Sequence, residues 1–416
     1  MSDALQRPPK KNPLERSNVP LLPPGARSIS TLGLLIGAAE GRFLLQTCAG
    51  CGHVIYPVRD ICPECLGQDL SFKETVPGGQ LLSETTIDIT ADPYFRRRPP
   101  TRQGLVQADC GARMIALLHR DCQAEGRVTL SIKTDGAGQP VIFAHPEAGG
   151  GPHMEDDPVW RELTAQPKFR RILISDGRSP VAVPLIKQLL VAGADAVFVG
   201  VSERWKPYLE LEQTVAGMGN VSLHDLDLRD ERSVFELASE IGGKTDILIN
   251  TAHHFRPGSL FDAGQTLRAK DAFDMNALGL LRLAQAFGGA MLGRGGDGDR
   301  SAAAWVNVLS IWSQSGRPAS AIYAAAQAAE LSLAQSLRGE MSHGGVRVSN
   351  VFVGPMEEPW FEDMPPPKVA PAAVAKSILK ALNEGLEDVY VGDIAVEFRD
   401  RMKRNPKEVE RLMWGG

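Results

Sequence analysis

Apolar and polar positions alternate in short runs over the first third of the chain. Residues 1–31 are rich in Pro, Arg, Lys and Ser and have no apolar periodicity, which predicts a flexible tail. From residue 72 to residue 143, short β-like runs such as GRVTLSIKT alternate with Gly/Pro breaks, which predicts a small all-β barrel. We therefore expect a helix and cysteine-rich segment over 32–76, a barrel over 77–147 and a Gly/Pro/acid-rich linker over 148–168.

The pattern changes after residue 168. Apolar strand-like runs then alternate with amphipathic helical stretches up to the end of the chain. Regular β/α alternation with short connections predicts one doubly wound α/β domain over 169–416, with a parallel sheet covered on both faces. Expected strands lie at 170–175, 195–202, 221–228, 245–252, 302–310, 346–354 and 388–392, and the longest expected helices at 271–292 and 321–341.

Composition narrows the class of protein. The chain has 416 residues, of which 43 % are hydrophobic and 23 % charged, as in a globular protein rather than a disordered or fibrous one. No apolar run approaches the roughly 20 residues that span a bilayer, and the N-terminus has no apolar signal core. We expect a cytoplasmic protein without a membrane partner. The net charge of −5 argues against a general nucleic-acid binder.

All six cysteines precede residue 123, and four of them form two C-x-x-C pairs: Cys48 with Cys51, and Cys62 with Cys65. Two such pairs ten residues apart are typical of a metal site in a reducing compartment. Four thiolates leave no open coordination position, which predicts a structural zinc ion. Iron is the alternative, because four thiolates suit both metals.

The cysteine segment EGRFLLQTCAGCGHVIYPVRDICPECLG, followed by a small β domain, resembles the DUF35 family over residues 32–147. The resemblance implies a rubredoxin-like zinc ribbon joined to an OB-fold. It also implies a thiolase-like or aldolase-like acyl-CoA enzyme as partner.

A basic patch lies within the expected barrel. Arg96, Arg97 and Arg98 follow two aromatic residues, and Arg102 is close by. These side chains are candidates for contact with the phosphates of a CoA thioester, or with single-stranded nucleic acid in the manner of other OB-folds. A solvated loop is the alternative, since charge runs usually carry no ligand. We expect nucleic acid not to be a partner.

In the second half, Ser310 and Tyr323 lie thirteen residues apart, at the end of an expected strand and the start of an expected helix. Together with Asn276 in FDMNALG and Asp227 in DLDLRD, they resemble the short-chain dehydrogenase/reductase (SDR) family, which has a Rossmann-type fold. The resemblance implies that Ser310 holds a substrate carbonyl and that Tyr323 transfers the proton. It implies that Asn276 completes the catalytic set, and that Asp227 reads the adenine of the cofactor.

Two other positions align with cofactor-binding residues of that family. Asn250 begins the segment Asn-Thr-Ala-His where the family has Asn-Asn-Ala-Gly, so His253 replaces a glycine. An exposed loop is the expected setting of His253 and His254. Gln327 stands where the Y-x-x-x-K motif has its lysine. Neutral glutamine can hydrogen-bond a ribose but cannot lower the pKa of Tyr323 from its ordinary value of about 10.

The phosphate-binding turn departs further from the family. Asp176, Pro180 and Ala182 replace the three glycines of T-G-x-x-x-G-x-G. Glycines there let the backbone approach a pyrophosphate at a helix N-terminus. Pro180 has no N–H group to donate to a phosphate, and the carboxylate of Asp176 carries the same negative charge as the phosphate. The stretch instead favours an empty helix start, with Ser179 as N-cap and Pro180 as the first helical residue. We expect NAD(P) not to bind.

These features support a first hypothesis of a subunit without independent redox activity in an acyl-CoA-processing complex. The zinc-ribbon half would dock the thiolase- or aldolase-like enzyme. The SDR half would pair with itself or with an active SDR subunit through its long helices. The second hypothesis is an active NAD(P)-dependent ketoacyl-CoA reductase using Ser310, Tyr323 and Asn276. A nucleic-acid-binding OB module is a weaker alternative.

Overall fold

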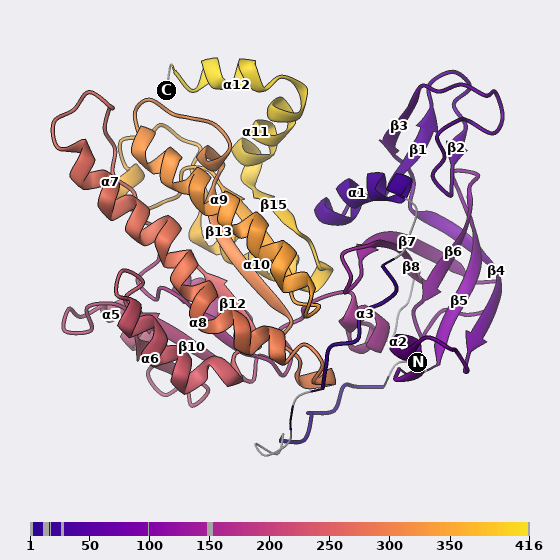
Figure 1. The fold of residues 1–416 in the computed structure, drawn as a ribbon, viewed down its shortest axis with the longest axis horizontal. Helices are drawn as coiled ribbons and strands as arrows, with labels where there is room; N and C mark the ends of the chain where they lie inside the picture. Colours follow the sequence, from indigo (N-terminus) through magenta and orange to yellow (C-terminus); the bar gives the residue numbers. More distant parts are fainter. Residues whose placement is uncertain are drawn as a thin grey trace. The chain divides into compact units, whose positions relative to one another are not determined.

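The chain forms two compact units in the computed structural model, which describes residues 3–10, 16, 18–25, 29–98, 100–147 and 153–414. Unit 1 is built mainly from Leu21–Ala165, and unit 2 from Gln166–Asn383 and Asp388–Gly416. Figure 1 shows the elements of both units. Parts of the expected tail and linker, including residues 26–28 and 148–152, lie outside the described residues. No helix in the described part of the chain is both long enough and apolar enough to cross a bilayer.

Unit 1 begins with a short helical segment and a three-stranded antiparallel sheet of order β2-β1-β3. These elements are η1 (Ile29–Leu34), α1 (Leu35–Glu40), β1 (Leu44–Cys48), β2 (Val54–Ile55) and β3 (Leu70–Glu74). β1 is buried along its whole length, so it forms the centre of this small sheet. The cysteine pairs therefore lie beside a rigid strand.

A closed five-stranded barrel of order β4-β5-β6-β8-β7 completes unit 1. Its strands are β4 (Gly78–Ile87), β5 (Thr101–Ala108), β6 (Arg113–Leu118), β7 (Arg127–Thr134) and β8 (Pro140–Pro146), with α2 (Pro93–Arg96) between β4 and β5. Alternate residues of β6 and β7 are buried, as the period of two requires. The pattern-based prediction of a small all-β barrel agrees with this closed sheet.

The second part of the expected linker is helical rather than extended. η2 (Met154–Asp156) and α3 (Pro158–Glu162) both belong to unit 1. Asp157 caps α3 by accepting hydrogen bonds from the N–H groups of Val159 and Trp160, and Pro158 occupies the first turn. The ring of Trp160 packs on Phe143 with centroids 5.5 Å apart. The Asp157 cap and the contact between Trp160 and Phe143 thus stabilise a helix in a stretch whose composition predicts a linker.

Unit 2 contains a seven-stranded parallel sheet of order β11-β10-β9-β12-β13-β14-β15. Its strands are β9 (Arg171–Ile174), β10 (Ala196–Val201), β11 (Val221–Asp225), β12 (Ile247–Asn250), β13 (Ala304–Ser310), β14 (Arg347–Val353) and β15 (Asp388–Val391). β12 and β13 are buried almost throughout, as strands covered on both faces must be. This parallel sheet confirms the prediction of a doubly wound α/β domain.

Helices cover the sheet of unit 2. They are α4 (Ala182–Val191), α5 (Leu209–Val215), α6 (Glu231–Ile241), α7 (Gln265–Phe273), α8 (Gly279–Gly293), α9 (Ala321–Ser342), α10 (Pro371–Glu384), α11 (Gly392–Arg404) and α12 (Pro406–Leu412). Figure 1 shows α8 and α9 lying across one face of the sheet. There Phe287 of α8 and Met341 of α9 share a core with Trp305 of β13. The core thereby packs the second half of α9 against the start of β13.

The single helix expected over 271–292 is broken. A π-helical turn, η4 (Asp274–Leu278), separates α7 from α8. Asn276 lies in this turn and is fully buried. Its amide Oδ1 accepts from His254 N at 2.7 Å, and Nδ2 donates to His254 O at 3.3 Å. The side chain thus binds a neighbouring loop, at the kind of helix interruption that often marks a functional site.

Candidate functional site

The four paired cysteines meet at one point of unit 1. The sulfur atoms of Cys48, Cys51, Cys62 and Cys65 all lie within 4.8 Å of one another. The Sγ atoms of Cys48 and Cys65, and those of Cys51 and Cys62, are 3.5 Å apart. A tetrahedral ion with Zn–S bonds of about 2.3 Å has sulfur–sulfur edges of about 3.8 Å. The four thiolates therefore fit a structural zinc ion, which would supply a cross-link between the two C-x-x-C turns.

Backbone groups favour the thiolate form at this centre. The N–H groups of Cys51 and Gly50 donate to Cys48 Sγ and lower the pKa of the Cys48 thiol to about 7. Metal ligation requires deprotonated sulfur, so these hydrogen bonds prepare Cys48 for an ion. Burial and neighbouring sulfur atoms act the other way on its partners: they raise the pKa of Cys51 to about 12, and the pKa of Cys65 is raised as well.

In unit 2, the order in which strands are added to the sheet reverses between β9 and β12: β10 and β11 lie on one side of β9, and β12 to β15 lie on the other. Ligands of doubly wound sheets bind outside the carboxyl ends of the strands at this place. Asp176 follows β9, Asn250 ends β12 and Ser310 ends β13. The fold therefore brings the sequence-predicted residues of unit 2 to one edge of the sheet, and we refer to this edge as the crevice.

The turn between β9 and α4 has a different geometry from the expected one. α4 begins at Ala182 behind Val181, which offers no side-chain cap, so the predicted N-cap role of Ser179 is wrong. Ser179 O instead accepts from Ala182 N at 2.9 Å, and this tight turn delays the start of the helix by two residues. Asp176 Oδ1 accepts from Arg178 N at 2.9 Å. A carboxylate thus takes an N–H group that an incoming phosphate would need.

Arg178 is bound to the chain rather than available to an anion. Its guanidinium donates to Ser202 O and Glu203 O, each at 2.9 Å, and to Lys206 O. These three carbonyl groups lie in the loop after β10. The positive charge that could offset Asp176 is therefore directed into that loop.

A buried hydrogen-bond network joins the carboxyl ends of three strands to α9. Ser175 Oγ donates to Asn250 Oδ1 at 2.8 Å, and Asn250 Nδ2 donates to Glu330 Oε1 at 3.1 Å. Gln327 Nε2 donates to Glu330 Oε2 at 2.6 Å, while Gln327 Oε1 accepts from Ser310 N at 2.7 Å. Both ends of the Gln327 amide are thus committed within the domain, and Gln327 and Glu330 are fully buried.

Glu330 is a functional candidate that sequence reasoning missed. Burial raises its pKa well above the ordinary value, against the opposing effect of hydrogen bonds from Gln327 and Asn250. The neutral acid is therefore favoured, since among the described residues no cation pairs with the buried carboxylate. Its position three residues after Gln327 on α9 was the available signal, because that spacing places both side chains on one helix face.

Tyr323 is enclosed by aromatic rings. Only 4 % of Tyr323 is exposed. Its ring makes T-shaped contacts with the rings of Phe255 and Trp312, with centroid distances of 4.9 Å and 6.1 Å. Phe361 packs on Phe255 at 4.4 Å. We call these four side chains the aromatic cluster. Burial raises the pKa of Tyr323, and Glu330 and Glu358 add to the increase against a hydrogen bond from Ser310.

An ion pair spans the crevice next to the aromatic cluster. His253 Nε2 and Glu358 Oε1 are 3.1 Å apart, and the imidazole ring lies 6.5 Å from that of Tyr323. Burial is the largest single effect and disfavours the charged imidazole, but the hydrogen bond and charge of Glu358 and the charge of Asp176 together outweigh it and raise the pKa of His253. The expectation of an exposed His253 is wrong: its side chain is 18 % exposed. Glu358 is 105 residues away in sequence, so no local signal could reveal the pair.

Asp227 also has a partner of its own. Its carboxylate binds the guanidinium of Arg229 at 3.0 Å and accepts from Arg229 N at 3.0 Å. Burial opposes ionisation, but these bonds prevail and lower the pKa of Asp227. The predicted adenine contact of Asp227 is not tested by this geometry and stays a prediction.

These contacts do not fit an NAD(P) cofactor. The phosphate turn carries Asp176 in place of a glycine, and Arg178 is turned away from it. Both amide atoms of Gln327 are hydrogen-bonded within the domain, Gln327 is fully buried, and only 4 % of Tyr323 is exposed. We derive no reaction step through a nicotinamide.

Most of the arginine patch of unit 1 is engaged within the chain. Arg98 binds Glu162 at 2.7 Å and lies 3.4 Å above the ring of Tyr94. Arg102 donates to Glu84 and to Arg120 O. Arg96 donates to Ala91 O at 2.8 Å, whereas Arg97 is exposed. A phosphate contact of these residues stays a prediction, and Arg97 is the best placed of them to make one.

Family models match both units of the chain. Residues 37–71 match the ChsH2, rubredoxin-like zinc ribbon domain, and residues 172–366 match the short chain dehydrogenase family. The first match covers the four cysteines, and the second covers the crevice from β9 to the loop after β14.

Individual proteins are similar to about half of this chain. A short-chain dehydrogenase, virD, of Hypocrea virens is 29 % identical over 203 residues, which cover 48 % of this chain and 61 % of that protein. An uncharacterized oxidoreductase of Staphylococcus aureus is 28 % identical over 210 residues, covering 49 % and 86 % of the two chains. Among solved structures, a short chain dehydrogenase from Burkholderia cenocepacia in complex with NADP is 26 % identical, with a TM-score of 0.53, covering 60 % and 98 % of the two chains. The chain thus joins a ChsH2-type, rubredoxin-like zinc ribbon to a domain of the short-chain dehydrogenase family.

Proposed function

We propose that the short-chain dehydrogenase domain of this protein acts as a binding and assembly domain without NAD(P)-dependent turnover. The carrying observation is the buried network in which Gln327 is held between Ser310 N and Glu330. A lysine at this position of the family would present a positive charge to the ribose and to the tyrosine. Here a neutral amide points into the core and supports the backbone of β13 instead.

The state of Tyr323 supports the same proposal. A proton donor to a substrate carbonyl must lie within hydrogen-bond reach of that oxygen, in a site that substrate can enter. The rings of Phe255, Trp312 and His253 pack around the ring of Tyr323. Its raised pKa further depletes the tyrosinate needed for alcohol oxidation.

For unit 1, we propose an OB-type barrel that docks a thiolase- or aldolase-like acyl-CoA enzyme. The strand order β4-β5-β6-β8-β7, with β6 and β8 parallel, supports the barrel type. The adjoining zinc ribbon and the resemblance to the DUF35 family support the partner. The long helices α8 and α9 are the proposed contact of unit 2 with a second copy or with an active SDR subunit.

The test for unit 2 is titration of the purified zinc-loaded chain with NADH and NADPH in a calorimeter. We expect no binding heat up to about 1 mM, the range in which weak cofactor sites still register. Saturable binding at micromolar concentration would overturn the proposal. For unit 1, native co-purification followed by mass spectrometry should recover a thiolase-like or aldolase-like enzyme, and recovery of the chain alone would argue against the docking role.

The competing function is an active ketoacyl-CoA reductase. It is favoured by the hydrogen bond between Ser310 and Tyr323, which keeps the reacting pair of the family together. The oxidoreductase names of the similar proteins point the same way. NADPH-dependent reduction of a ketoacyl-CoA that is lost in Tyr323→Phe would establish this function instead.

A further inference from the structure

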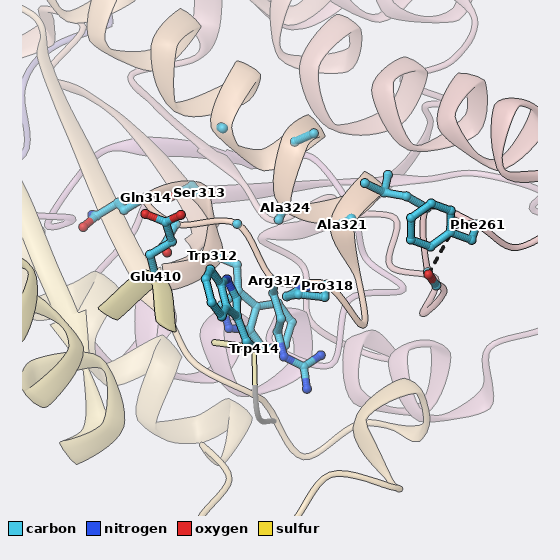
Figure 2. Close-up of a pocket in the computed structure, with 16 residues that line it drawn as sticks. Phe261, Trp312, Ser313, Gln314, Arg317, Pro318, Ala321, Ala324, Glu410 and Trp414 are labelled. Carbon is cyan, nitrogen blue, oxygen red and sulfur yellow. Dashed lines mark hydrogen bonds between the residues drawn. The ribbon is translucent and has the colours of Figure 1, made fainter. Parts of the chain in front are cut away.

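A cavity of about 570 Å³ opens beside Trp312 in unit 2 (Figure 2). Its size is in the range of small-molecule sites, which hold a few polar groups among mostly apolar ones. One wall is the alanine-rich first part of α9, including Ala321, Ala324 and Ala328. Small side chains there leave a smooth surface against which a flat apolar body can lie.

Large apolar side chains around this cavity are exposed to water. Phe261 is 98 % exposed, Leu260 64 % and Trp414 57 %. All three line the cavity. Exposed apolar side chains gathered around one hollow mark a binding surface, because covering them removes their contact with water.

Arg317 brings a positive charge into this apolar setting. Its guanidinium lies 4.6 Å from the ring centroid of Trp312, and Nη1 donates to Ser320 Oγ at 3.3 Å. Burial alone lowers the pKa of Arg317, with no contribution from any acid. Among the residues that the structure describes, no carboxylate forms an ion pair with it. A half-buried guanidinium of this kind is suited to a ligand oxyanion, which it can bind through two parallel hydrogen bonds.

One acid does line the cavity, and it is satisfied elsewhere. Glu410 pairs with Lys407 at 2.6 Å. Figure 2 shows Glu410 and Phe261 at opposite ends of the cavity, with Arg317 between them. A ligand anion at Arg317 therefore does not have to displace or face an unpaired carboxylate.

We propose that this cavity binds an apolar carboxylate, with the carboxylate on Arg317 and the hydrophobic body between Trp312, Trp414 and the alanine face of α9. The site is separate from Tyr323, which does not line the cavity. Trp312 contributes to both places, since it also packs on Tyr323. The proposal does not depend on whether the domain carries out redox chemistry. It requires that a contact of α9 with a second copy or an SDR subunit leaves the first part of this helix uncovered.

The experiment compares a carboxylate with its neutral isostere on the full-length, zinc-loaded chain. 2-Naphthoate and 2-naphthamide are titrated by calorimetry and by quenching of tryptophan fluorescence. We expect the carboxylate to bind about tenfold or more tightly than the amide, as for a hydrogen bond to a charged group. This comparison needs no variant, so it stands even if a substitution fails to fold.

Variants then locate the site. Arg317→Gln should remove the preference for the carboxylate and leave the weak binding of the amide. Arg256→Gln is the matched control, because Arg256 also stacks on a tryptophan, 3.7 Å from the ring of Trp360, yet does not line the cavity. Its binding of 2-naphthoate should equal that of the unmodified chain.

Three results would overturn the proposal: equal affinity for the two probes, no binding of either, or a carboxylate preference that survives Arg317→Gln. A second copy is the other occupant that the exposed rings can accept. If the chain sediments as a dimer that Phe261→Asp dissociates, and neither probe binds the dimer, the cavity belongs to an interface between copies.

Discussion

Gln327 Nε2 donates a hydrogen bond to Glu330 Oε2 over 2.6 Å, and neither side chain is exposed. The two residues lie one turn apart on α9, where the glutamine stands in the place of the lysine of the SDR motif. The acid accepts from the amide, and the amide in turn accepts from Ser310 N at 2.7 Å. This relationship converts a cofactor-facing position into a support for the end of β13.

Restoring the lysine should therefore not restore a dehydrogenase. In Gln327→Lys, the ammonium group enters a buried position beside Glu330, and Ser310 N loses its acceptor. We expect a loss of about 1–3 kcal/mol in the free energy of unfolding, as for a buried donor left without a partner. NADPH consumption with a ketoacyl-CoA should stay at background. Urea unfolding and a spectrophotometric assay measure the two quantities, and a gain of turnover would show that only the lysine was missing.

Glu330 should make stability depend on pH. Its folded-state pKa is raised, so the stabilisation associated with its proton is complete below the unfolded pKa of about 4.3 and is lost as pH rises through the folded pKa. Glu330→Gln removes this titration, because the amide has no proton to lose. The free energy of unfolding should fall as pH rises above about 4.3 in the unmodified chain and fall less steeply in the variant. Identical slopes would show that Glu330 does not titrate there.

His253 should titrate above an ordinary histidine. Glu358 and Asp176 together outweigh burial and raise its pKa, so the charged imidazole persists to a higher pH and its stabilisation is lost only above that point. In Glu358→Gln the pKa should drop, because burial then acts without the carboxylate. NMR titration of the imidazole resonances measures both values. His145 of unit 1, whose pKa is lowered by burial with no contribution from Glu358, serves as the internal reference and should not respond to the substitution.

The cysteine centre should hold one metal ion whose loss unfolds part of unit 1. Cys62→Ser should abolish stoichiometric zinc, measured by elemental analysis, and lower the melting temperature of unit 1. The control is Cys110→Ser, which alters a cysteine outside the four-sulfur cluster and should keep the metal. Chelation of the unmodified chain should reproduce the Cys62→Ser effect, because ligand binding energy of a structural site is folding energy. Retention of metal by Cys62→Ser would place the ion elsewhere.

The local pattern of the sequence determined the elements of secondary structure and the metal ligands. A period of two in the barrel strands, continuous apolar runs in the parallel sheet, and two C-x-x-C pairs are all short-range signals. They indicate their structures because backbone geometry and metal coordination act over a few residues. The loss of the motif lysine and glycines was visible for the same reason.

Only the tertiary structure shows which contacts the residues make that replace the motif lysine and glycines. Sequence alone could not show that Gln327 turns inward to Glu330 and Ser310, that His253 pairs with Glu358, or that Phe255 packs on Tyr323. These partners come from separate strand ends and loops, up to 105 residues apart. They meet only because the parallel sheet gathers the carboxyl ends of its strands at one edge, and burial there then sets which groups stay neutral and which form pairs.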